Sequence, residues 1–121
     1  MIIVTNNPLV TKEISNKKVI YKESTYIEIL KDCRDLIHKG YELLSHPLYG
    51  SVKPNETPYR SIVVKEGKNI DTNSIILIEE AINTASKFQA NKNTPIWTQR
   101  VLDDFQVIDF DILNNTLQRI L

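Results

Sequence analysis

The chain has 121 residues, of which 41% are hydrophobic and 25% charged, and its 15 basic side chains balance its 15 acidic ones. A chain of this length forms one domain. The balanced charge provides no basic field for nucleic acid, and no apolar run approaches the ~18 residues that span a bilayer. We therefore expect a single cytoplasmic domain over residues 1–121, with neither a nucleic-acid nor a membrane partner.

The N-terminal elements alternate between strand and helix. Residues 2–5 are apolar on both alternating faces, which is typical of a strand in the interior of a sheet. Pro8 suits the first turn of a short helix that extends through Ile14. Residues 19–21 then predict a second strand.

The next helix has recognisable ends. Ser24 or Thr25 can cap it, since Glu28 stands three residues after Thr25 in capping-box spacing, and Gly40 can end it. Apolar residues between them recur at helical intervals. The pattern then becomes extended at residues 41–45 and again, after a long polar loop, at residues 61–64.

The C-terminal third of the sequence is helical. Asp71, Thr72 and Asn73 offer caps for a helix whose apolar residues continue along one face to Phe88. Residues 91–95 form a polar break. Residues 97–105 and 111–121 predict two further helical segments.

The order of these elements predicts an α/β fold. We expect a single three-layer domain with a short, mostly parallel sheet of about four strands and helices on both faces. In such sheets ligands bind outside the carboxyl ends of the strands. Here those ends include residues 5–7, 23–25, 45–59 and 65–67.

The segment at residues 45–59 looks least like scaffold, because three prolines restrict its backbone and one glycine allows a turn within it. Loops of this length are usually functional or disordered. The candidate ligand-binding residues are Asn6, Asn7, His46, Ser51, Lys53, Asn55, Glu56 and Thr57. The alternative is that the prolines form a rigid crossover and the polar side chains face water.

The same residues do not match any known cofactor or metal motif. Lys53 follows Gly50 without the glycine spacing of a phosphate-binding loop, and Asn6 stands where dinucleotide-binding folds place glycine. Cys33 is the only cysteine and lies on an apolar helix face, as an unreactive core thiol would. We expect no cofactor and no metal, and assign no catalytic residue.

Three sequence blocks resemble the GrdX family, small proteins encoded with the glycine, sarcosine and betaine reductase components of anaerobic amino-acid-fermenting bacteria. They are VTNNPLV at residues 4–10, HPL with GSVKPNETPY at residues 46–48 and 50–59, and DDFQVID at residues 103–109. The resemblance implies a metabolic setting, amino-acid reduction, but no mechanism and no catalytic residue. Reductase components of that system work through selenocysteine, cysteines or pyruvoyl groups, so this chain resembles an accessory protein.

Three functional hypotheses follow. The first is an accessory or regulatory protein that binds a small anionic metabolite or a glycine reductase component at the strand-end crevice. The second is a small enzyme that uses His46 or Glu56 as acid or base and Lys53 as an anion contact. The third is a structural or oligomeric module, for example a homodimer formed through aromatic residues.

Overall fold

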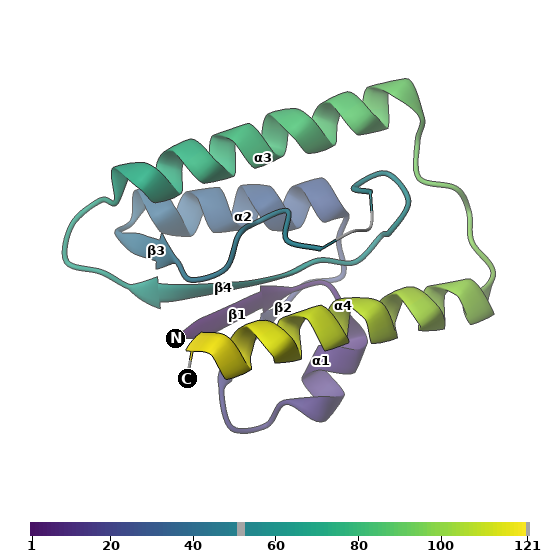
Figure 1. The fold of residues 1–121 in the computed structure, drawn as a ribbon, viewed down its shortest axis with the longest axis horizontal. Helices are drawn as coiled ribbons and strands as arrows, with labels where there is room; N and C mark the ends of the chain where they lie inside the picture. The colour runs from purple at the N-terminus through teal and green to yellow at the C-terminus, as the bar shows by residue number, and fades with distance from the viewer. Residues whose placement is uncertain (51–52, 121) are drawn as a thin grey trace.

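The structure, a computed structural model, describes residues 1–50 and 53–120 (Figure 1). Its elements are β1 (Ile2–Thr5), α1 (Pro8–Glu13), β2 (Lys18–Tyr21), α2 (Tyr26–His38), β3 (Tyr41–Leu43), β4 (Ser61–Glu66), α3 (Thr72–Asn91) and α4 (Gln99–Ile120). The fold is therefore α/β, with one four-stranded sheet and four helices. None of the helices described is both long and apolar enough to cross a membrane.

The four strands lie in the order β2-β1-β4-β3. β1 and β2 run parallel, whereas β4 is antiparallel to both of its neighbours. The predicted mostly parallel sheet is therefore wrong, and the sheet is mixed. The described part of residues 44–60 contains no helix and returns the chain directly beside β3, so it is not the crossover that a parallel β4 requires.

The direction of β4 changes which segments meet at the end of the sheet where the ligand site is predicted. Thr5 at the end of β1 pairs with Ser61 at the start of β4. The carboxyl end of β4 therefore lies beside the amino-terminal end of β1. Residues 65–67 do not belong to the predicted crevice. The carboxyl ends of β1, β2 and β3 do lie at the same end of the sheet, together with the segment that leads into β4.

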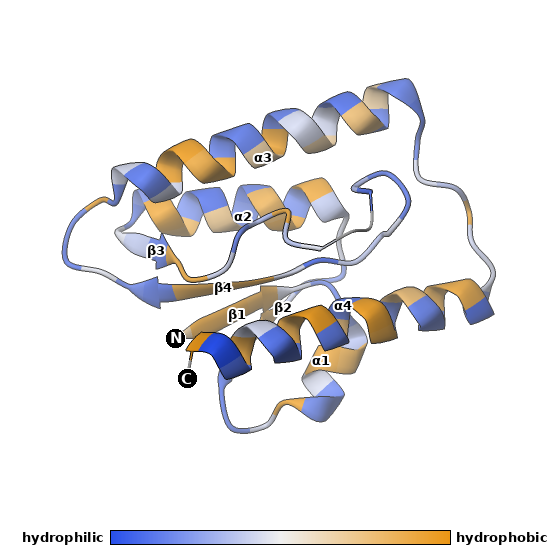
Figure 2. Cartoon of the chain, viewed as in Figure 1, coloured by the Kyte–Doolittle hydropathy of each residue, from blue (hydrophilic) through white to orange (hydrophobic). Residues whose placement is uncertain are grey.

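Alternate residues of β1 enter two separate hydrophobic clusters. Ile2 and Val4 pack with apolar residues of α2 and α3, while Ile3 packs with residues of α1 and α4. Figure 1 shows the two helix pairs on opposite sides of the sheet. Figure 2 shows the central strands β1 and β4 as mainly hydrophobic and the helices as mixed, as expected for helices with one face on a core.

The starts of α2 and α3 follow from capping signals that are local in the sequence. Thr25 Oγ1 accepts a hydrogen bond from Glu28 N at 3.2 Å, and the carboxylate of Asp71 accepts one from Ser74 N at 3.0 Å. Among the candidate caps, the structure therefore uses Thr25 for α2 and Asp71 for α3. The prediction of two C-terminal helical segments is wrong, because α4 continues through residues 106–110, where no glycine or proline interrupts it.

Candidate functional site

A buried group of hydrogen bonds joins the end of β1, the start of β4 and α4. Asn7 N donates to Thr5 Oγ1 at 2.9 Å, and the Thr5 and Ser61 hydroxyls lie 2.7 Å apart. Ser61 Oγ donates to Asp109 Oδ2 at 2.6 Å, and Asn7 Nδ2 donates to the same oxygen at 3.0 Å. Because Ser61 gives its proton to Asp109, Thr5 is the donor toward Ser61. The chain of donors from Thr5 through Ser61 therefore ends at the Asp109 carboxyl group, while Asn7 Nδ2 also donates to Gln106 O at 2.9 Å.

That carboxyl group is ionised less readily than an exposed one. Asp109 is 5% exposed. Burial raises the pKa of Asp109, while the hydrogen bonds from Ser61 and Asn7 and the charge of Arg60 oppose the rise. The folded protein therefore holds the Asp109 proton to higher pH than the unfolded chain does.

Asn6 has a different role, in which all its side-chain groups bond to backbone. Its Nδ2 donates to the carbonyl oxygens of Ser24 at 2.9 Å and Pro58 at 2.8 Å. Its Oδ1 accepts from Arg60 N at 2.8 Å. Asn6 thus ties the end of β1 to the segment before α2 and to the segment before β4.

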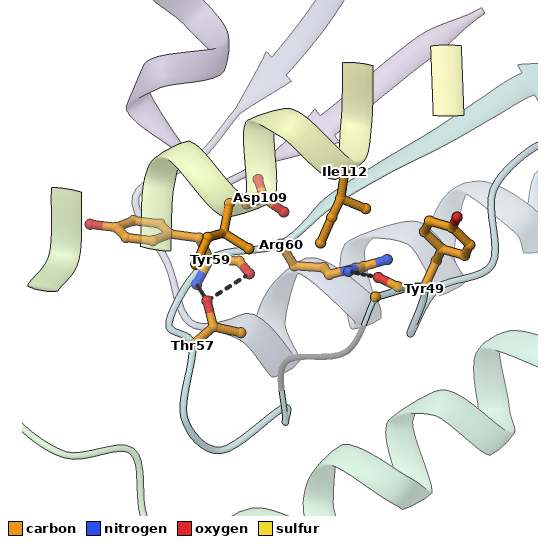
Figure 3. Close-up of a pocket in the computed structure, with 8 residues that line it drawn as sticks. Tyr49, Thr57, Tyr59, Arg60, Asp109 and Ile112 are labelled. Atoms are coloured by element: carbon orange, nitrogen blue, oxygen red, sulfur yellow. Dashed lines mark hydrogen bonds between the residues drawn. The ribbon is translucent and has the colours of Figure 1, made fainter. Parts of the chain in front are cut away.

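The buried side chain of Arg60 binds the backbone of the loop between β3 and β4. Its side chain is 6% exposed and donates to the backbone oxygens of Tyr49 at 2.5 Å and His46 at 3.1 Å. Figure 3 shows the guanidinium reaching from the middle of the site to Tyr49, with Asp109 and Ile112 above it on α4. The cavity between these groups is about 10 Å³. It is large enough for about one water molecule and too small for a metabolite.

An open crevice lies beside this closed centre. Its volume is about 460 Å³, and its walls are residues 24–27 at the start of α2, Pro58, Gln89 near the end of α3, and residues 93–94. None of these lining residues is ionisable at neutral pH. The two wall segments at Ser24 and Pro58 are the ones that Asn6 holds together.

A family model described as GrdX-like protein matches residues 2–118. The chain belongs to the GrdX-like protein family. No curated protein and no solved structure matches it significantly. The family resemblance inferred from three short blocks is thus confirmed over nearly the whole GrdX-like chain, from β1 into the last turn of α4.

In this GrdX-like protein the predicted site residues that the structure describes do not gather in one cavity. Asn6, Asn7 and Thr57 are buried, and their side chains bond to other groups of the chain. His46 is exposed, and its Nδ1 accepts from Leu48 N at 3.1 Å. That bond is the backbone-capping role that a lone histidine before proline commonly has.

The remaining candidates lie in the turn that follows. Lys53 and Glu56 are exposed, whereas Asn55 is 8% exposed and donates through Nδ2 to Lys92 O at 3.0 Å. Its Oδ1 is buried and has no partner among the described residues. Ser51 lies outside the described residues. Whether any of these residues binds a ligand remains a prediction.

Other chemistry-bearing groups also have defined places. Cys33 is fully buried, as predicted, and burial raises the pKa of its thiol, so it stays protonated and unreactive. Among the residues that the structure describes, no three His, Cys, Asp or Glu side chains are grouped as a metal site would require.

Asp109, Arg60 and the lining of the open crevice are not among the site residues predicted from the sequence. One signal could have identified Asp109, since it is followed at four-residue spacing by Leu113 and Leu117, the other buried residues of α4. A carboxylate on the apolar face of a helix requires buried partners. No comparable sequence signal identifies Arg60 or the crevice, because the residues that surround each of them are far apart in the sequence.

Proposed function

We propose that this GrdX-like protein is an accessory or regulatory protein of glycine, sarcosine and betaine reductase metabolism that binds a small metabolite in the open crevice. The observation that carries the proposal is the crevice of about 460 Å³ at the carboxyl ends of β1 and β2. Its volume lies within the range of roughly 300–1,000 Å³ that ligand pockets occupy. Its position is the one at which α/β sheets bind ligands.

The lining favours a ligand with no net charge. Hydroxyl, amide and apolar groups line the crevice, from Ser24, Gln89, Asn93 and their neighbours. A phosphate or dianion buried there would lack a cationic partner, which is costly. A small zwitterion such as glycine, sarcosine or betaine fits better, because the first backbone amides of α2 lack helical acceptors and favour a carboxylate.

The enzyme hypothesis gains no comparable support. His46 Nδ1 is engaged by the Leu48 amide, and Glu56 lies on an exposed turn. Proton transfer requires an acid or base within hydrogen-bond reach of a bound substrate. Neither side chain lines the crevice.

A thermal-shift titration tests the proposal. Glycine, sarcosine and betaine are compared with acetyl phosphate and inorganic phosphate. A ligand that binds only the folded state at 100 times its Kd stabilises it by about 2.7 kcal/mol, which raises the Tm by several degrees. We expect the shift from the zwitterions.

Matched variants locate the binding site. Asn93→Trp fills the crevice from an exposed position, whereas Asn83→Trp adds the same side chain to an exposed position of α3 outside it. The ligand-induced shift should disappear in the first variant and persist in the second. A shift retained in Asn93→Trp would refute the crevice as the binding site, and no shift with any compound would count against metabolite binding.

A further inference from the structure

We infer that the free edge of β2 is a docking site for an extended, acidic segment of a partner protein, which adds to the sheet as a further strand. β2 is the last strand at its end of the sheet. Its residues Ile20 and Tyr21 are 37% and 41% exposed. This inference is independent of the metabolite crevice, which lies beyond the end of the strand.

The backbone of β2 has hydrogen-bonding groups directed away from the sheet. Lys22 N donates to Thr5 O at 3.0 Å, and Thr5 pairs with Tyr21 in the parallel register. Alternate residues of a strand direct their amide and carbonyl groups to opposite sides, so those of Val19 and Tyr21 face outward. Within the described chain, neither residue makes a backbone hydrogen bond outside the sheet.

The side chains along this edge select for negative charge. Lys17 and Lys18 precede the exposed apolar residues, Lys22 follows them, and no acidic residue lies between. Lys22 has one acidic neighbour, Asp32, at 3.6 Å, whereas Lys17 and Lys18 form no ion pair with any described residue. An incoming strand with an acidic residue opposite each of Lys18 and Lys22 would therefore form favourable cross-strand pairs.

The same lysines disfavour a second copy of the chain at this edge. In a symmetric antiparallel dimer, the register that joins the outward groups of Val19 to those of Tyr21 also places Lys18 opposite Lys22, twice. Like charges directly opposite each other destabilise a strand pair, and edge lysines commonly prevent self-association. In this register the edge therefore favours an acidic strand over a second copy of the chain.

A peptide titration followed by NMR tests the inference on the full chain. The probe is Ser-Glu-Val-Thr-Val-Glu-Ser, whose two glutamates can lie opposite Lys18 and Lys22. We expect saturable shifts of the Val19 and Tyr21 amides, hydrogen exchange of these amides slowed at least tenfold at saturation, and weaker binding at higher salt. A matched peptide with lysines in place of the glutamates should bind at least tenfold more weakly.

Two variants separate backbone pairing from charge. Tyr21→Pro removes an outward amide while leaving the bonds to β1, so it should abolish binding of the acidic peptide in a chain that retains its dispersed spectrum. The double variant Lys18→Glu, Lys22→Glu should reverse the preference and select the lysine peptide. Together these results would establish strand addition governed by charge.

Three outcomes would overturn the inference. Equal affinity for both peptides would remove the charge selection. Shifts confined to residues outside β2 would place the peptide elsewhere. Shifts at Val19 and Tyr21 that grow with protein concentration in the absence of peptide would show that a second copy is the occupant.

Discussion

Asn7 Nδ2 and Asp109 Oδ2 lie 3.0 Å apart although the residues are separated by 102 positions in the chain. Asn7 Oδ1 also accepts from Leu9 N at 3.0 Å and caps the start of α1. One side chain therefore links α1 to α4, the two helices that share a hydrophobic cluster on one face of the sheet. Because the Asp109 carboxylate is buried, its removal leaves donors without partners.

We expect Asp109→Ala to lower the free energy of unfolding by about 1–3 kcal/mol, since the Ser61 and Asn7 donors lose their acceptor in a buried site. Asp109→Asn should lose less, because its amide oxygen can still accept. Urea unfolding of both variants measures the difference. Equal losses would show that volume rather than hydrogen bonding matters at this position.

The same carboxyl group should make stability depend on pH. Its folded pKa is raised above the unfolded value of about 3.9, so the folded state binds more protons in the interval between the two values. The free energy of unfolding should therefore fall as pH rises through that interval. Because Asp109→Asn cannot titrate there, its stability relative to the wild type should improve as pH increases from about 4 toward neutral. A difference independent of pH would contradict the raised pKa.

Arg60 should hold the loop at residues 46–49 in place. We expect Arg60→Met to remove its bonds to the carbonyls of Tyr49 and His46 and to lower the free energy of unfolding by about 1.5–3 kcal/mol. Limited proteolysis should then cut the loop faster. Lys53→Met, at an exposed position of the following turn, is the control and should leave the cleavage rate unchanged.

Asn6 should contribute to stability and to the shape of the crevice. Asn6→Asp keeps the acceptor for Arg60 N but removes both donors to Ser24 O and Pro58 O. We expect a loss of about 1–3 kcal/mol in the free energy of unfolding and a weaker ligand-induced thermal shift. Asn83→Asp, on an exposed helix surface, should show neither effect. Unchanged stability of Asn6→Asp would mean that these bonds contribute nothing net.

Gly50 should not tolerate a side chain. Its φ is 122°, and a Cβ atom there would lie 2.8 Å from Ile112 Cδ1. We expect Gly50→Ala to destabilise the fold by about 1–3 kcal/mol through backbone strain and overpacking. Adding Ile112→Val removes the clashing methyl group, so a double-mutant cycle should show partial rescue. Strictly additive losses would show that the strain lies in the backbone alone.

Local signals predicted most elements of the fold correctly. Ile2–Thr5 lies inside the sheet because its residues are apolar on both faces, and Thr25 and Asp71 begin helices because their oxygens accept from amides three residues later. The prediction of two C-terminal helical segments is wrong because residues 106–110, which contain no glycine or proline, continue the helix. Residues 106–110 include Asp109, whose buried partners are Asn7, at the start of α1, and Ser61, in β4.

The candidate site was predicted less well than the fold. The sequence directed attention to the strand ends, and Asn6 and Asn7 follow the end of β1, but their binding role stays a prediction. It could not show that their side chains bond to backbone groups and to Asp109, because those partners are 18 to 102 positions away. The crevice could not be predicted from the sequence either, because its walls combine residues 24–27 with Pro58 and the end of α3.

The sequence by itself determined the family, the α/β class and the apolar faces of the strands and helices, because these depend on the spacing and type of neighbouring residues. Only the tertiary structure decided the direction of β4, the burial of Asp109 and the position of the crevice. The physical reason is that the loop from β3 to β4 is long enough for either strand direction. Which direction is adopted depends on contacts such as those of Thr5 with Ser61 and of Asn6 with Arg60, which form only when distant segments meet.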